Sequence, residues 1–393
     1  MNKYRKTWDY HIEYAKQNKY LLQQERIDLV AALKFFKAEL GKGFLKSTNR
    51  HHPMQQMIFN TVAAEANDLI SYYRTLNRLK TNAINYDGLI NKFRSENDCR
   101  KEGIPFIEVA DLLRTQGCRL EFVKENKVQG QKHADILITQ ANSETEIVIE
   151  VSHLGESDFR KLNSRNFRKI DELFNHTPPY LPYSLQQLQD IPESEVDRVI
   201  AKLGEFKSSA DTLSKRIISY ADDYVDLIIT GQHNRESFDQ HCQSVGRKIG
   251  YDSMEVDFND TSRITRKLRE EAKQISQGYA GLVVIKTLPL FFLSLIQSLS
   301  PSFNAIEREL EKRPQVAGLI VFGEMQIDPG HIEISWGCGH ILRTRKVTPY
   351  TTQAILYLKN REFNHQKGQV VWKWIEDSLD TSLHQASETV YNG

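Results

Sequence analysis

Two carboxylates stand in neighbouring apolar runs of this sequence. Asp135 interrupts the aliphatic run 133–139, and Glu150 lies in a second run, 145–153, which follows the polar turn 140–144. Both runs have the length and the β-branched content of strands. A carboxylate in an apolar strand is costly to bury unless its charge is compensated. We therefore expect Asp135 and Glu150 to lie on adjacent strands with a cation between them.

The second run predicts a strand that is buried on both faces. Because strand side chains alternate between faces, Glu150 shares one face with Val148 and Ser152. The other face carries the remaining aliphatic side chains, Ile147, Ile149 and Val151. Both faces are mainly apolar, so this strand is expected in the centre of a sheet.

An Asp on one strand, followed on the next by Glu-x-Lys or a polar substitute for the lysine, resembles the core of the PD-(D/E)XK nuclease superfamily. The resemblance rests on Asp135 and on Glu150-Val151-Ser152, in which Ser152 occupies the usual lysine position. Some restriction enzymes of the superfamily carry Glu or Gln at that position. The resemblance implies that Asp135 and Glu150 bind Mg²⁺ or Mn²⁺ beside a scissile phosphate, with the backbone carbonyl of Val151 completing the sphere.

The segment before Asp135 predicts a helix and then a strand. Pro105 opens a helical pattern that ends before Gly117, and residues 119–123 alternate as a strand. One helix followed by three strands is also the opening order of the superfamily core. The resemblance implies that Glu108, on this helix, contributes to the metal site through water. A solvated helix acid explains the same residue equally well.

The segment after residue 259 predicts a crossover helix and a parallel strand. Asp260 or Thr261 caps a helix over residues 263–276, and the continuous apolar run 282–285 predicts a strand covered on both faces. Lys267 and Gln274 fall on one side of this helix, together with Glu270 or Glu271. The resemblance implies that Lys267 and Gln274 face the site and that Lys267 supplies the charge missing at Ser152. A surface Lys-Glu pair explains the same spacing.

The span between the two halves of this core reads as an insertion. It begins with basic residues that could contact DNA phosphates or form the solvated face of a helix, namely Arg160, Lys161, Arg165, Arg168 and Lys169. Later in the span, residues 224–231 predict a strand, and Glu255 with Asp257 forms a rival acid pair that would relocate the site. Most of the remaining span favours helix.

The expected fold is therefore α/β, with a restriction-endonuclease-like mixed sheet flanked by helices. Its strands are expected at 120–122, 136–138, 147–151, 282–285 and 319–322. A chain of 393 residues has room for two or three domains. We expect a helical N-terminal region (1–100), a nuclease-like α/β core (101–154 and 260–345), a large, mostly helical insertion (155–259) and a C-terminal segment (346–393).

The composition is that of an ordinary globular protein, with 40% hydrophobic and 26% charged residues and a formal charge of +1. Near-neutral charge means that any binding of nucleic acid must depend on local patches. Four cysteines without a paired framework favour a reducing compartment. The start has no apolar core of signal-peptide length, and the most apolar run, 282–299, is interrupted by polar residues and proline. We expect a cytoplasmic protein without a membrane partner.

Other catalytic motifs are missing from the sequence. It has no GxGxxG, no phosphate loop ending in Lys-Ser/Thr, no GxSxG and no HExxH. Cys338 and His340 bring a thiol close to an imidazole, but no third group is evident, and a turn after a strand is the favoured interpretation.

Three functions remain open. The first is a metal-dependent endonuclease acting on double-stranded DNA, in a restriction-modification or phage-defence system and as a homodimer if both strands are cut. The second is a catalytically inactive nuclease-like module that binds nucleic acid or a partner protein. The third is a structural protein whose buried acids are satisfied by backbone groups and arginines.

Overall fold

The computed structural model divides the chain into two compact units, Met1–Gly155 with Phe258–Gly393, and Glu156–Asp257. The residues that the structure describes are 7–46, 51–60, 62–113, 118–123, 134–140, 145–155, 165–166, 168–212, 216–252, 260–276, 278–287, 301–325, 332–335, 338–364, 366 and 368–391.

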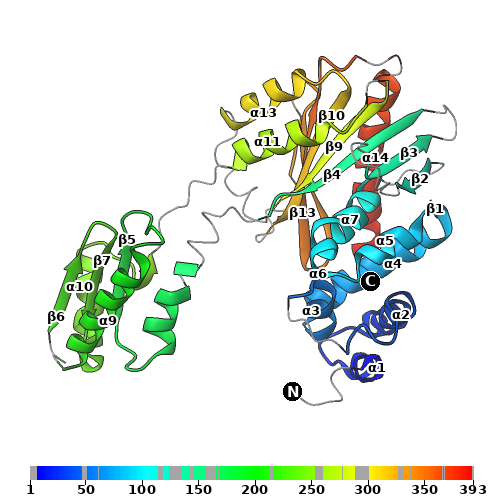
Figure 1. Ribbon diagram of the computed structural model, residues 1–393. Helices are drawn as coiled ribbons and strands as arrows, with labels where there is room; N and C mark the ends of the chain where they lie inside the picture. Colours follow the sequence, from blue (N-terminus) through cyan, green and yellow to red (C-terminus); the bar gives the residue numbers. More distant parts are fainter. Residues whose placement is uncertain are drawn as a thin grey trace. The chain divides into compact units, whose positions relative to one another are not determined.

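The larger unit is built on one nine-stranded mixed sheet (Figure 1). Its order is β1-β2-β3-β4-β9-β10-β13-β12-β11. Strand β3 is antiparallel to both β2 and β4, whereas β4, β9 and β10 are parallel to one another, and β13 runs antiparallel to β10. The strands are β1 (Ala83–Ile84), β2 (Cys118–Phe122), β3 (Ile136–Gln140), β4 (Glu146–His153), β9 (Ala280–Lys286), β10 (Val316–Met325), β11 (Glu333–Ser335), β12 (Ile341–Thr348) and β13 (Thr351–Lys359).

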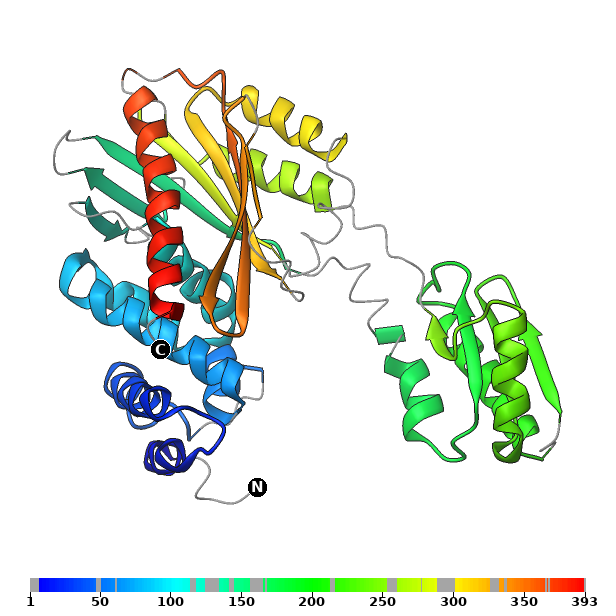
Figure 2. The ribbon, with the colours of Figure 1, turned by 180° about the vertical axis from the view of Figure 1, so that it is seen from behind.

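Helices cover both faces of this sheet (Figures 1 and 2). On one face lie α11 (Asp260–Ala272) and α13 (Pro301–Glu311). The other face carries α14 (Gly368–Tyr391), α4 (Ala63–Asn82), α5 (Tyr86–Lys92), the π-helical turn η2 (Cys99–Gly103) and α7 (Ile104–Leu112). The remaining N-terminal helices pack on these helices rather than on the sheet, and they are α1 (Trp8–Gln17), α2 (Gln23–Leu40), α3 (Pro53–Phe59) and α6 (Glu96–Asp98). The mixed α/β architecture with a flanked sheet confirms the broad fold class.

Alternation along β4 divides its side chains between two hydrophobic cores. The first core contains Ile147, Ile149 and Val151, which pack with the N-terminal helices and α14. The second core contains Val148, which packs with α11 and α13. Glu150 and Ser152 share the face of Val148 and therefore point toward α11. The predicted central strand is confirmed, because β4 lies between β3 and β9. All five predicted core strands lie in this one sheet.

The crossover helix α11 follows from its amphipathic pattern. Ile264, Leu268 and Ala272 recur every four residues and are all fully buried against the sheet. Strand β9, which follows it, is apolar on both faces because it lies between β4 and β10. The strand–helix–strand connection predicted across the insertion is thus present.

The smaller unit has a sheet of its own, of order β6-β7-β5-β8. Its elements are η3 (Glu172–His176), β5 (Tyr183–Gln187), α9 (Val196–Thr212), β6 (Ile217–Ala221), β7 (Val225–Thr230), η4 (Gln232–Asn234), α10 (Arg235–Ser244) and β8 (Gly250–Asp252). The insertion therefore contains a four-stranded sheet in addition to the predicted helices, and β7 coincides with the strand predicted at 224–231. Strand β5 is rich in Ser and Gln, and tertiary contacts satisfy those polar groups: Arg247 Nε donates to Ser184 Oγ, and Tyr251 Oη donates to Gln187.

The predicted boundary at residue 346 falls inside β12 and does not mark a separate segment. Strand β13 pairs with β10 from Thr352 to Lys359 and with β12 on its other side. Helix α14 then packs Val371 and Ile375 into the first core. Within the described residues, no helix is long and apolar enough to cross a membrane.

Candidate functional site

The hairpin of β3 and β4 brings Asp135 and Glu150 together. Ile136 lies opposite Ile149 in this antiparallel pair, so Asp135 follows as the residue opposite Glu150. Directly opposite side chains share a face and have Cβ atoms about 4.5–5.5 Å apart. The backbone N–H of Val151 donates to Oδ2 of Asp135 over 2.8 Å and holds this carboxylate against β4. Glu150 is 1% exposed, so its carboxylate is fully enclosed.

Burial makes Asp135 hard to ionise. The pKa of Asp135 is raised to about 7, mainly by desolvation and to a lesser extent by the charges of Glu271 and Glu102, while the Val151 hydrogen bond and Lys92 act in the opposite direction. Near neutral pH the carboxyl group is therefore only partly ionised. A divalent cation at this position would stabilise the ionised form, as predicted from the two acids.

A third carboxylate, Glu271, approaches from α11. It is 8% exposed, and α11 packs against β4. Gln274 Nε2 donates to Oε2 of Glu271, and Lys267 Nζ lies 3.7 Å from its Oε1. The predicted residues Lys267 and Gln274 therefore meet on this side of the helix through Glu271. Glu271 stands four residues after Lys267 and directly before the buried Ala272. This spacing was the sequence signal that placed Glu271 on the same side of the helix as Lys267.

The charge of Lys267 is shared between two acids of its own helix. Its Nζ also lies 3.7 Å from Oε2 of Glu270, and the side chain is 30% exposed. The structure therefore shows the Lys-Glu pair that was the alternative interpretation. Ser152 is 6% exposed and lies opposite Ile285 on β9. No charge stands at that position.

Glu108 does not join the acid pair, which corrects its predicted role. It lies on α7, whose side chains pack in the first core, on the face of the sheet opposite to Glu150. Lys286 Nζ lies 2.7 Å from both of its carboxylate oxygens, and Tyr72 Oη donates to Oε1 over 3.1 Å. Burial raises the pKa of Glu108, and the Lys286 charge opposes that shift. At 8% exposure, Glu108 is not a solvated acid either.

A polar cavity lies beside this ion pair. It has a volume of about 20 Å³, enough for a water molecule but not for a nucleotide. Asp68 and Glu324 line it together with Glu108 and Arg345. Burial raises the pKa of Asp68 to about 7, with a further contribution from Glu324. The cavity is therefore a structural polar pocket rather than a substrate site.

Basic side chains gather where β4 ends. His153 is the register partner of Lys286 on β9, and Arg263 Nη2 donates to the carbonyl oxygen of Gly155, just beyond the strand. The turn η2, which packs against β4, carries Arg100 and Lys101. Burial lowers the pKa of His153 to about 4, and the charges of Lys286, Arg100, Arg263 and Lys101 lower it too. His153, at the end of β4, is thus surrounded by positive charges.

The basic segment proposed to contact DNA is only partly described. Arg160 and Lys161 lie outside the described residues, as do Glu255 and Asp257 of the rival acid pair. In the described part, Arg165 pairs with Glu193 at 2.6 Å and Lys169 with Asp197 at 2.7 Å, while Arg168 is exposed. These pairs neutralise two of the charges that phosphates would need.

The smaller unit as a whole is acidic. Residues 156–257 contain 18 Asp and Glu against 13 Lys and Arg, and the rest of the chain contains 33 against 39. Excess positive charge therefore resides in the larger unit, which also carries the acid pair.

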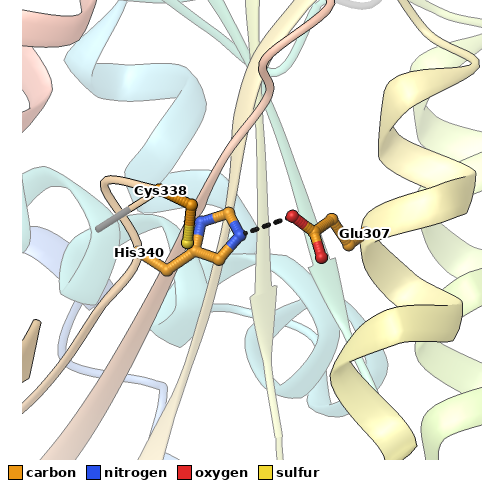
Figure 3. A group of neighbouring side chains, drawn as sticks. All are labelled: Glu307, Cys338 and His340. Carbon is orange, nitrogen blue, oxygen red and sulfur yellow. Dashed lines mark hydrogen bonds and ion pairs between the residues drawn. The ribbon is translucent and has the colours of Figure 1, made fainter. Parts of the chain in front are cut away.

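One further cluster could in principle hold a metal. Among the described residues, a single group of three or more His, Cys, Asp or Glu has its ligand atoms within 4.8 Å of one another: Glu307, Cys338 and His340 (Figure 3). By this criterion Asp135, Glu150 and Glu108 are not such a group. Glu307 on α13 supplies the third group that the sequence did not reveal, and His340 follows the turn between β11 and β12.

The hydrogen bonds of His340 argue against a metal in this cluster. The backbone N–H of Lys359 donates to Nδ1 of His340 over 3.1 Å, so the proton of the neutral ring resides on Nε2, which lies 3.0 Å from Glu307 Oε1. A metal-bound histidine instead donates the N–H of its other nitrogen to an acceptor. Arg361 also lies 3.2 Å from Glu307 and hydrogen-bonds to Cys338. The cluster is therefore a polar junction between α13 and the sheet.

No known protein family and no curated protein matches this sequence.

Proposed function

We propose that this protein is a metal-dependent endonuclease that cleaves phosphodiester bonds in DNA. The observation that carries the proposal is the placement of Asp135 opposite Glu150 at the end of a buried hairpin. A fully buried Glu150 and a partly buried Asp135 on adjacent strands are costly unless their charges are compensated. The PD-(D/E)XK resemblance implies that a compensating cation takes part in phosphodiester cleavage.

The order of the surrounding elements supports a restriction-endonuclease-like core. Helix α7 is followed by β2, β3 and β4 as three successive antiparallel neighbours, and α11 then leads to β9, parallel to β4. The smaller unit enters between β4 and α11, so it does not interrupt these strands.

The residues at the site fit a hard cation that keeps much of its water. Mg²⁺ is commonly bound by one or two carboxylates with water completing its octahedron. Asp135 and Glu150 would be the protein ligands, and Glu271 would hold a metal-bound water. A bound Mg²⁺ or Mn²⁺ would polarise the phosphate and lower the pKa of the attacking water. Val151 would act mainly through its N–H, which orients Asp135.

A second candidate function is a catalytically inactive nuclease-like module that binds nucleic acid. The observation that favours it concerns the described residues: Ser152 is neutral, and the charge of Lys267 is shared between Glu270 and Glu271. In the endonuclease, Lys267 would turn from Glu270 toward the phosphate and stabilise its developing charge. The 30% exposure of Lys267 leaves room for that movement.

A cleavage assay separates these functions. Supercoiled, linear and phage-derived modified DNA would be incubated with the full chain and Mg²⁺ or Mn²⁺. We expect metal-dependent cleavage that Asp135→Asn and Glu150→Gln abolish while thermal unfolding still reports a folded protein. Glu270→Gln, a substitution on the exposed side of α11, is the matched control and should retain cleavage. Metal binding without cleavage of any DNA would support the inactive module.

A further inference from the structure

We propose that Arg100, Lys101 and Arg263 form the surface that receives the phosphate backbone of duplex DNA. This inference rests on the proposed function, because it places the scissile strand beside Asp135 and Glu150. It replaces the basic segment 160–169 as the principal DNA contact.

Two separate elements, η2 and α11, place these cations around the end of β4. Arg100 and Lys101 lie on η2, which packs against β4. Arg263, in the first turns of α11, binds the carbonyl of Gly155, five residues beyond Glu150. At about 3.3 Å per residue, the backbone from Glu150 to Gly155 spans at most about 16 Å. Phosphates advance about 3.4 Å per nucleotide along a duplex strand, so this reach covers several consecutive phosphates.

Arg100 and Lys101 keep charge available for a ligand. Arg100 and Lys101 are exposed, and the hydrogen bond of Arg100 goes to a neutral group, the carbonyl of His51, at 2.7 Å. The nearest acid in sequence, Glu102, is bound by Lys92. Two further acids, Glu96 and Asp98, lie on the preceding helix α6. Lys286, by contrast, is only 15% exposed and is neutralised by Glu108, so it is not part of the surface.

The surface suits duplex backbone rather than unpaired bases. Proteins that bind single strands stack bases on exposed aromatic rings. None of the large hydrophobic side chains exposed in the described residues lies on η2 or α11. Arginine and lysine contacts to phosphates position a duplex without reading its sequence. The net positive charge of the larger unit acts in the same direction.

Binding of a fluorescent 30-base-pair duplex in EDTA tests the surface without cleavage. We expect Arg100→Ala with Lys101→Ala to weaken binding at least tenfold and to reduce the slope of log K against log salt by about 1.8, since each lost phosphate contact contributes about 0.9. Lys101→Glu, a single exposed substitution, should weaken binding in the same direction if the double variant folds poorly. Arg165→Ala with Arg168→Ala is the matched control and should leave affinity and slope unchanged.

The outcomes separate this surface from the nuclease proposal. One outcome is a wild type that binds duplex DNA but cuts none with either ion, while the Arg100 and Lys101 variants bind more weakly. This result would support the surface and refute the nuclease function. Cleavage by the wild type, with unchanged affinity and salt slope in these variants, would overturn the surface alone. A wild type that binds no duplex at low salt, or whose binding depends on Arg165 and Arg168, would also overturn it.

Discussion

Replacing Asp135 by Asn should stabilise the protein in a pH-dependent way. Burial raises the pKa of this carboxyl from 3.8 to about 7. The folded protein therefore holds the proton more tightly than the unfolded chain, and stability is lost as pH rises from about 4 to 7. Each pKa unit corresponds to about 1.4 kcal/mol, so the penalty at pH 8 approaches about 4 kcal/mol. Asn carries no such penalty, and its carbonyl oxygen can still accept the Val151 hydrogen bond.

The decisive quantity is the difference between variant and wild type at two pH values. Two pKa units separate pH 5 from the folded pKa, so the advantage of Asp135→Asn should grow by about 3 kcal/mol between pH 5 and pH 8. This corresponds to a further rise in the thermal midpoint of about 5–10 °C. Thermal unfolding followed by circular dichroism in EDTA measures it. The claim that burial raises the pKa of Asp135 would be refuted if the stability difference between variant and wild type were equal at both pH values. It would also be refuted if the variant were less stable than the wild type at pH 8.

Other regions give independent tests. Asp68→Asn should show the same direction of pH dependence, because burial also raises the pKa of Asp68 to about 7; a flat difference between pH 5 and 8 would contradict this. Lys286→Met should destabilise the fold by about 3–5 kcal/mol in chemical denaturation, since it leaves the carboxylate of Glu108 buried and unpaired. Glu108→Gln combined with Lys286→Met should recover part of that loss, and a double variant no better than the single one would argue against the pairing. Zn²⁺ should not raise the thermal midpoint of the wild type through His340, so a rise that His340→Ala removes would overturn the hydrogen-bonded junction.

The strands that carry the acid pair were predictable because their signal is local. Asp135 and Glu150 lie in short apolar runs on either side of a polar turn, and a hairpin is the shortest connection between such runs. Strand periodicity also fixed the face that Glu150 shares with Ser152. Periodicity and chain proximity therefore account for the part of the site that sequence reasoning could place.

The partners of other charged residues depend on contacts that no local pattern contains. Glu108 is bound by Lys286, which lies 178 residues away in the chain. Its helix is apolar almost all round, so the sequence does not indicate which face of the sheet Glu108 meets. The sequence does not distinguish Glu271 from Glu270 on the same helix, because only the packing of α11 on β4 shows which of the two faces the site. Strand β5 was missed because its polar side chains are satisfied by residues about 64 positions away.

Calorimetry with Mn²⁺ and Mg²⁺ tests the central claim most directly. Titrations of the wild type, the Asp135→Asn/Glu150→Gln double variant and the Glu270→Gln control would be run at pH 8, where Asp135 is largely ionised. We predict one bound ion in the wild type and in the control, and none at this site in the double variant. Equal binding, or equal absence of binding, in the wild type and the double variant would show that Asp135 and Glu150 are not metal ligands.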